Sequence, residues 1–189
     1  VVLVGGVEKC TPVTGIDTPE MTRIFVSAAD RQYEQPTGIT FPGVFALMTK
    51  RHMEQYGTTE EQLAEIAVKN HAHGTHNPRA HFGKDTSIEA VLDSPLVVDP
   101  FHLMDCCPFS AGGSAALVVS DQYADSFAAP VDVTGLGHGT DLVPAPDKAA
   151  PLAPHAARPA AERAHAQAGI TPRQPAPSEA QPSITAAEV

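Results

Sequence analysis

The sequence predicts an α/β fold, and three features carry that prediction. A β-branched apolar run, Val1–Val4, stops at Gly5–Gly6, which is typical of a strand buried on both faces of a sheet. From Val44 onward, apolar residues recur at helical spacing. A glycine-rich turn at 110–114 then leads into Ala115–Val119, a second apolar run that we expect to form another buried strand.

The segments between these strands predict a helical hairpin preceded by a loop. Residues 8–42 contain several prolines and glycines and are expected to be mostly loop. The helix that starts near Val44 should end at Gly57, because glycine readily adopts the left-handed backbone that closes a helix. Thr58 and Glu61 are then spaced as a capping box that begins a second helix.

The second helix is predicted to be amphipathic. Its expected inner face consists of Leu63, Ile66 and Ala67, with Asn70 as a further candidate. A polar loop at 70–84 should follow. Thr86 and Glu89 are spaced as another capping box, so we expect a short helix at Ile88–Leu92.

The last third of the chain has a different composition. Val131–Gly135 is predicted to be a third strand. Residues 141–189 then contain 9 of the 18 prolines and 15 alanines, which is the composition of a linker. One helix is predicted inside this region, at about Ala160–Ala168, with Pro159 near its first turn and Gly169 at its end.

Composition and charge disfavour several classes of protein. A net charge of -10 and a pI near 5.2 would repel the phosphate backbone of nucleic acids. Three cysteines, two of them adjacent, make a poor disulfide framework and favour a reducing, cytoplasmic setting. We expect neither a secretory leader nor a membrane span. The chain opens without Met in an apolar run, so we expect further sequence upstream of Val1.

A cluster of histidines suggests a metal site. His71, His73, His76 and His81 could supply the imidazole nitrogens that zinc and copper prefer. Against this hypothesis, no carboxylate or thiolate lies close in sequence, and a turn at Asn77 can splay the rings apart. We therefore expect no metal site here.

Two further motifs have both a functional and a structural interpretation. Cys106 and Cys107 could include a reactive thiol, although small apolar side chains packed where the chain enters the sheet are the favoured interpretation. The segment Gly135–Gly139 resembles a phosphate loop only superficially, because it lacks the lysine and the spacing. We interpret it as a tight connection after a strand.

Several motifs occur together in an order that points to one family. They are Gly6-Val7-Glu8-Lys9, Ala46-Leu47-Met48, His52-Met53-Glu54-Gln55-Tyr56-Gly57-Thr58, Lys69-Asn70-His71-Ala72-His73 with Asn77-Pro78, and Asp105-Cys106-Cys107-Pro108 with Ser110 and Gly112. In this order the chain resembles the thiolase portion of sterol carrier protein x and its bacterial and archaeal relatives. The likeness is strong from Val1 to about Asp121, and it continues more weakly through Val131–Asp141 and again at Ala160–Pro172.

The resemblance implies a thiolase-like α/β fold of the five-layer αβαβα type, seen in part as an interior fragment. Residues 1–125 would form the end of the N-terminal thiolase half with an inserted loop region that covers coenzyme A. Residues 126–189 would form the start of the C-terminal half, rich in Pro and Ala. The activity implied is that of an acyl-CoA C-acyltransferase, in thiolysis of 3-oxoacyl-CoA or Claisen condensation, within lipid or sterol side-chain metabolism.

The resemblance also implies site residues. Cys107, Phe109, Ser110 and Gly112 would contact coenzyme A. The nucleophilic cysteine of the family is expected upstream of Val1, and Gln181 stands where the family has His or Asn. The chain by itself is therefore expected to be inactive.

The implied ligands and partners complete the prediction. A coenzyme A thioester is the expected substrate, with no bound cofactor. The expected protein partners are further copies, in a homodimer or homotetramer, and a small OB-fold protein; a eukaryotic version would be peroxisomal. The alternative is a non-catalytic thiolase-like subunit that binds acyl-CoA or a partner. It is modestly favoured by Ala111, where the family commonly has Asp, and by 181–183, where the family's His or Asn motif is missing.

Overall fold

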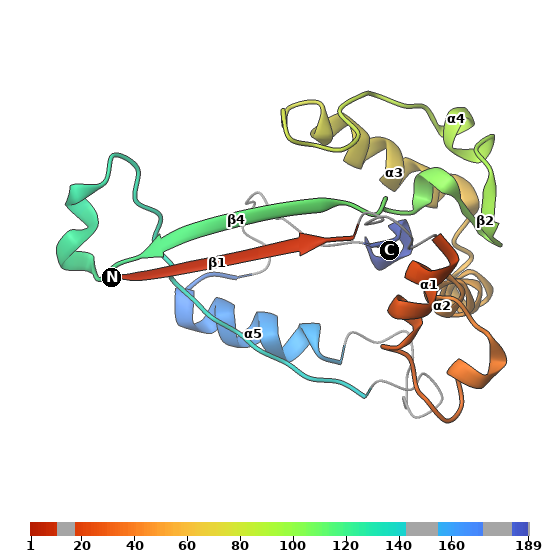
Figure 1. Ribbon diagram of the computed structural model, residues 1–189, viewed down its shortest axis with the longest axis horizontal. Coiled ribbons are helices and arrows are strands. Elements are labelled where there is room, and N and C mark those ends of the chain that lie inside the picture. Colours follow the sequence, from red (N-terminus) through yellow and green to blue (C-terminus); the bar gives the residue numbers. More distant parts are fainter. Residues whose placement is uncertain (11–17, 143–154, 172–182, 189) are drawn as a thin grey trace. The chain divides into compact units, whose positions relative to one another are not determined.

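The computed structural model describes residues 1–10, 18–142, 155–171 and 183–188 (Figure 1). The chain is mixed α/β, as predicted, and divides into two compact units. The first unit consists of Val1–Thr11, Ser110–Asp141 and Ala153–Ser178, and the second of Pro12–Phe109, Leu142–Leu152 and Glu179–Val189. Each unit is described by itself below.

The first unit contains a long antiparallel ribbon. Strand β1 (Val2–Lys9) pairs with β4 (Ala111–Val118) in a register that runs from Val2 opposite Val118 to Lys9 opposite Ala111. The strand therefore continues through Gly5–Gly6, where we expected it to stop, and the predicted turn at 110–114 is mostly strand. Paired glycines are tolerated here because the ladder is made by backbone groups, which do not require a side chain.

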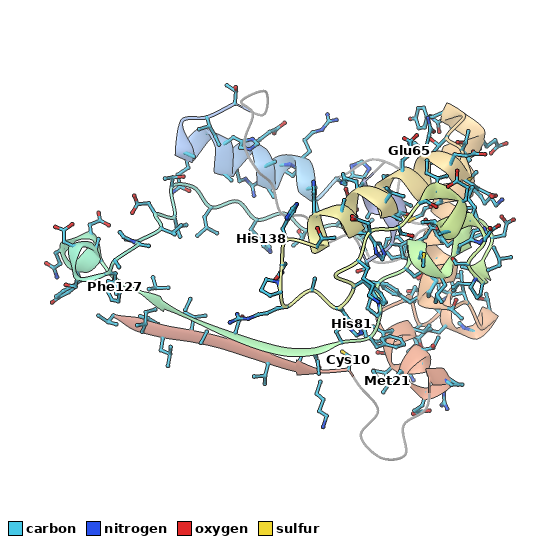
Figure 2. All side chains as sticks on the ribbon, turned by 90° about the horizontal axis from the view of Figure 1, so that it is seen from above. Cys10, Met21, Glu65, His81, Phe127 and His138 are labelled. Carbon is cyan, nitrogen blue, oxygen red and sulfur yellow. The ribbon has the colours of Figure 1, made fainter. Side chains whose placement is uncertain are left out.

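The predicted burial of these strands is wrong for this chain. Leu3 is 71% exposed and Val4 is 53% exposed, and every residue of β1 and β4 is exposed. Figure 2 shows side chains projecting from both faces of the ribbon, with Cys10 just beyond the end of β1. A strand pattern predicts which residues can be buried, but burial itself needs a covering layer.

A helix and an extended segment pack closely in the same unit. Helix α5 (Ala157–Ala168) ends at Gly169, which has φ 67°, as the sequence predicted. The predicted third strand at Val131–Gly135 is wrong, because 131–141 forms no strand and instead runs along α5. The Leu136 N–H donates to Gln167 Oε1 at 2.8 Å, which fixes part of this contact.

The glycines of this extended segment face the alanines of α5. A Cβ placed on Gly135, Gly137 or Gly139 would overlap the backbone carbonyl oxygen of Ala164, Ala160 or Ala156, respectively. These alanines are four residues apart and share one helix face. Gly135–Gly139 is thus neither a phosphate loop nor a tight connection: it is a segment whose missing side chains allow backbone-to-backbone packing.

The second unit is mainly helical. Its helices and strands are α1 (Thr18–Val26), α2 (Phe41–Tyr56), α3 (Glu60–Gly74), α4 (Ile88–Leu92), β2 (Leu96–Val98) and β3 (Phe101–His102). Short 3₁₀ turns lie at Gln35–Thr37, Leu103–Asp105 and Thr185–Glu188. Helix α1 lies in the region predicted to be mostly loop. Pro19 stands in its first turn, where proline is tolerated because that N–H has no helical partner.

The ends of α2 and α3 follow local sequence signals. Gly57 closes α2 with φ 74°, as predicted. The capping box of α3 is shifted by one residue from our prediction, because Thr59 and Gln62 form it instead of Thr58 and Glu61. Thr58 instead places its hydroxyl 2.9 Å from His52 Nδ1.

Two other boundaries also differ. Helix α3 continues to Gly74, so His71 and His73 lie in its last turn and not in a loop. Helix α4 has the predicted bounds, but Ser87, and not Thr86, is its N-cap residue, with the hydroxyl accepting from the Ala90 N–H at 3.2 Å.

The core of the second unit consists of two small clusters around α3. Ala46, Leu63, Phe101 and Ile184 form the first, and Ala64, Ala67 and Val91 form the second. Leu63 and Ala67 are buried as predicted, whereas Ile66 and Asn70 are only half-buried and Ala64 is buried in their place. The first cluster includes Ile184, which is far from the others in sequence.

The packing of 135–139 on α5 can be tested by substitution. We expect Gly137→Ala to destabilise this contact by about 1–3 kcal/mol, because the new Cβ would overlap the Ala160 carbonyl. Amide hydrogen exchange should then be faster throughout α5. Gly112→Ala is the matched control, because a Cβ there meets no atom within 4 Å. Equal protection of α5 in both variants would contradict the close packing.

Candidate functional site

A hollow of about 170 Å³ lies beside the Cys106–Pro108 turn in the second unit. Its lining includes Asn70, His71, Phe82, Cys106, Cys107 and Thr185. The hollow thus combines the end of α3, the predicted coenzyme A turn and the 183–188 segment. It brings together two thiols, an imidazole, a carboxylate and a hydroxyl, from Cys106, Cys107, His71, Asp105 and Thr185.

Asp105 and Thr185 are the buried polar residues of this hollow, and Asp105 is the ionisable one of the two. Its side chain is 4% exposed, and its carboxylate accepts the His102 N–H at 2.9 Å and the Thr185 hydroxyl at 3.1 Å. Burial raises the pKa of Asp105, and the two hydrogen bonds offset part of that rise. The carboxylate therefore holds the 102–105 turn and Thr185 together.

The two adjacent cysteines differ in environment. Cys106 is half-buried and packs against the first core cluster, which confirms the structural interpretation for this residue. Burial, followed by the charge of Asp105, raises the pKa of Cys106 to about 11. Cys107 is exposed, so the packing prediction is wrong there, although partial burial raises its pKa as well. Neither thiol has the lowered pKa of an activated nucleophile.

His71 is held in a defined orientation. Its Nδ1 lies 3.1 Å from the Lys84 carbonyl oxygen, which can only accept, so Nδ1 carries the proton. Its ring stacks on Phe82 with centroids 5.7 Å apart, and His81 contacts the same phenyl ring at 5.1 Å. Figure 2 labels His81 in this region. Across the described residues, no group of three His, Cys, Asp or Glu is arranged to hold a metal ion.

The predicted coenzyme A residues fall in two units. Cys107 and Phe109 belong to the second, and Ser110 and Gly112 to the first. Phe109 stacks on Phe25 of α1, with centroids 5.3 Å apart and planes at 17°. Gln181, the residue at the position of the family His or Asn, lies outside the described residues.

The 183–188 segment docks on the site at four points. The Cys107 N–H donates to the Ser183 carbonyl at 3.0 Å, and Ile184 enters the core at 2% exposure. Thr185 bonds Asp105, and Glu188 pairs with Lys69 and accepts from Asn70 Nδ2 at 2.7 Å. Burial alone would raise the pKa of Glu188, but these partners lower it. Sequence analysis missed this segment, because no local signal links residues 80 positions apart.

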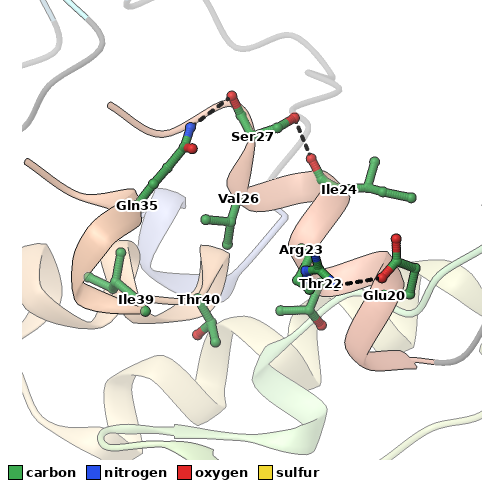
Figure 3. Close-up of a pocket in the computed structure, with 10 residues that line it drawn as sticks. Glu20, Thr22, Arg23, Ile24, Val26, Ser27, Gln35, Ile39 and Thr40 are labelled. Carbon is green, nitrogen blue, oxygen red and sulfur yellow. Dashed lines mark hydrogen bonds and ion pairs between the residues drawn. The ribbon is translucent and has the colours of Figure 1, made fainter. Parts of the chain in front are cut away.

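Two hollows of greater volume also lie in the second unit. The larger, about 580 Å³, is an open depression beside α1 and 35–40, where Arg23 pairs with Glu20 and Gln35 bonds the Ser27 carbonyl (Figure 3). The other, about 230 Å³, is mostly apolar and is lined by Met48, His52 and Ala186, among others. No predicted site residue lies in either one. None of the described helices is long and apolar enough to cross a bilayer.

The buried Asp105 carboxylate should make stability depend on pH. Because its folded pKa is raised, stability falls as pH increases from the ordinary aspartate value of about 3.9 through the folded value. Asp105→Asn should remove this component and change stability at neutral pH by no more than about 1 kcal/mol, since the amide can accept from His102 and donate to Thr185. Urea unfolding at acidic and neutral pH measures both. An unchanged pH slope in the variant would contradict the buried-carboxylate assignment.

Comparison with known proteins agrees with the motifs. No protein-family model matches the chain. An acetyl-CoA acetyltransferase of Methanocaldococcus jannaschii is 34% identical over 92% of this chain and 44% of its own length. That of Methanothermobacter thermautotrophicus is 39% identical over 67% of this chain and 33% of its own length. Sterol carrier protein 2 of Gallus gallus is 44% identical over 43% of this chain and 15% of its own length.

A solved structure supports the same relationship. The chain superposes on the "Ltp2-ChsH2(DUF35) aldolase" with a TM-score of 0.67 at 27% identity, over 76% of this chain and 41% of that one. The chain thus spans less than half the length of each of these relatives. The resemblance inferred from its motifs is confirmed: the chain is homologous, over part of their length, to the acetyl-CoA acetyltransferases and to the thiolase domain of sterol carrier protein 2.

Proposed function

We propose that this chain is part of a thiolase-type acyl-CoA C-acyltransferase with the five-layer αβαβα fold. Its reaction would be thiolysis of 3-oxoacyl-CoA or, in reverse, Claisen condensation, in lipid or sterol side-chain metabolism. Homology to acetyl-CoA acetyltransferases supports this proposal. The structural observation that carries it is the exposed Cys107, presented beside a hollow by a turn that a buried carboxylate holds.

Within that enzyme, we assign to this chain a binding role. Thiolase chemistry requires a thiolate, a base and donors for the thioester oxyanion within hydrogen-bond reach. Burial is the first cause of a raised pKa at each of the three cysteines, Cys10, Cys106 and Cys107, so none of these thiols is well suited to be the nucleophile. The nucleophile would then come from a part of the enzyme outside the present sequence.

Four residues are the proposed contacts for the acyl-CoA thioester: Cys107, Phe109, Ser110 and Gly112. Cys107 is exposed and Phe109 is 41% exposed, so both are accessible to a ligand. The ring of Phe109 is supported on one face by Phe25. Open space at Gly112 leaves its backbone accessible as well.

The second candidate is a non-catalytic thiolase-like subunit that binds acyl-CoA or a protein partner. Two departures from the family pattern favour it modestly: Ala111 stands where the family commonly has Asp, and Gln181 stands where the family has His or Asn. The structural relative is named with two components, Ltp2 and ChsH2(DUF35). By analogy, we propose a small partner protein for this chain, the role we gave to an OB-fold protein, beside assembly into a homodimer or homotetramer.

Binding of acetyl-CoA tests the proposed contacts. The wild-type chain should bind acetyl-CoA in isothermal titration calorimetry. Cys107→Trp should weaken binding by about tenfold or more, about 1.4 kcal/mol, because the indole would occupy the ligand's space. Cys107→Ser should bind within about twofold of wild type. Gln55→Trp, exposed at the end of α2, is the control for an added indole. Equal affinity in all variants would reject this binding site.

Turnover separates the two candidates. The protein encoded by the whole gene is incubated with acetoacetyl-CoA and CoA, and formation of acetyl-CoA is followed by chromatography. The enzyme proposal predicts acetyl-CoA, whereas the binding-subunit proposal predicts affinity without product. Failure of that protein to bind any acyl-CoA would reject the enzyme proposal and the acyl-CoA-binding form of the second candidate, and would leave only a subunit that binds a protein partner.

A further inference from the structure

The 183–188 segment makes more specific contacts with the second unit than a chain passing over a surface would need. Three of its side chains each enter a different environment: Ile184 the apolar core, Thr185 the buried Asp105 carboxylate, and Glu188 the pair formed by Lys69 and Asn70. The backbone adds a fourth contact at Ser183.

The contacts converge on the Cys106–Pro108 turn. The Ser183 carbonyl accepts the Cys107 N–H, and Ile184 forms an isolated antiparallel bridge with Cys106. Thr185 acts on the same turn indirectly, through Asp105, the residue just before the turn. One carboxylate oxygen of Asp105 accepts from the Thr185 hydroxyl, and the other accepts from the His102 N–H. The segment therefore holds the turn through its backbone and through the carboxylate at its base.

We propose that the 183–188 segment is a clamp that positions the Cys106–Pro108 turn and keeps the Cys106 thiol buried, with Thr185 as the principal positioning residue and Glu188 as an outer fastening. This inference goes beyond the proposed function and does not rest on acyl-CoA binding. Two residues of the clamp line hollows: Thr185 lines the hollow of about 170 Å³, and Ala186 lines the hollow of about 230 Å³. Release of the clamp would therefore change the walls of both.

Thr185 is assigned the larger effect for a physical reason. Thr185 is 5% exposed, and its hydroxyl donates to the carboxylate of Asp105, a residue that is itself buried. Removing that donor leaves one carboxylate oxygen buried and unsatisfied, which is a larger penalty than loss of an ordinary hydrogen bond. The ion pair of Glu188 with Lys69 is weaker, because Lys69 is 47% exposed and solvent screens it.

The thiol of Cys106 reports the state of the clamp. While the clamp is closed, Cys106 is half-buried and its pKa is near 11, so little thiolate is present at mildly alkaline pH. When the clamp opens, both the exposure and the thiolate fraction rise. Cys10 belongs to the first unit and serves as an internal reference for alkylation.

The test is alkylation of the full chain with iodoacetamide at mildly alkaline pH, with each cysteine followed by peptide mass spectrometry. Thr185→Val should raise the alkylation rate of Cys106 by about tenfold or more relative to the rate of Cys10. Amide hydrogen exchange at Cys107, followed by NMR, should accelerate to a similar extent. Thr185→Ser keeps the hydroxyl and should remain within about twofold of wild type.

Thr49→Val is the matched control. Thr49 is as buried as Thr185, at 4%, but its hydroxyl donates to the Phe45 carbonyl in its own helix. If Thr49→Val accelerates Cys106 as much as Thr185→Val does, general destabilisation explains the result and the clamp is rejected. The clamp is also rejected if Thr185→Val leaves both the alkylation rate of Cys106 and the amide exchange rate of Cys107 unchanged.

A milder variant covers the case in which Thr185→Val fails to fold. Glu188→Gln keeps an acceptor for Asn70 but loses the ion pair with Lys69. Alkylation of Cys106 is expected to be about two- to fivefold faster, because an ion pair with one exposed partner contributes only a small stabilisation to the closed clamp. No change in this folded variant would overturn the role of Glu188 as a fastening and, with it, the clamp as stated.

Discussion

The hydrogen bond between Thr185 and Asp105 joins two segments 80 residues apart, and much of the second unit depends on it. Asp105 is buried, and a buried carboxylate without donors would be costly. One oxygen is satisfied locally by His102, and the other is satisfied only because the distant segment arrives. The same segment packs Ile184 against Phe101 and Leu63, so it supplies both a hydrogen-bond donor for the buried carboxylate and an apolar side chain for the core.

This arrangement gives a physical account of how the candidate site is organised. The turn that exposes Cys107 is held by two interactions: the Asp105 carboxylate binds the His102 N–H, and the Cys107 N–H binds the Ser183 carbonyl. A ligand would therefore meet a preformed surface. His71 is oriented independently, by Lys84 and Phe82. The thiols of the turn remain protonated at neutral pH, because burial disfavours the charged form. These properties fit a surface that binds a thioester better than one that attacks it.

Local signals in the sequence predicted local features well. Gly57 and Gly169 were identified as helix ends, and α4 has the predicted bounds, because these features depend on a few neighbouring residues. The cap of α3 was misplaced by one position, since two consecutive threonines offer the same chemistry. Burial of β1 and the link between Asp105 and Thr185 could not be predicted, because both depend on what lies opposite in space. Only the order of motifs, through homology, identifies the family. The roles of Cys107, Phe109, Ser110 and Gly112 stay predictions from that resemblance.

The packing of 135–139 on α5 combines two different rises along the chain. An extended chain advances about 6.6 Å over two residues, and a helix about 6.0 Å over four. Alternate glycines therefore meet every fourth alanine with a mismatch of only about 0.6 Å per step. Such a match persists for a few repeats and then drifts out of phase. The three contacts at Gly135, Gly137 and Gly139 therefore come close to the length that this commensurate geometry can support, and a longer glycine ladder on a straight helix would gain little.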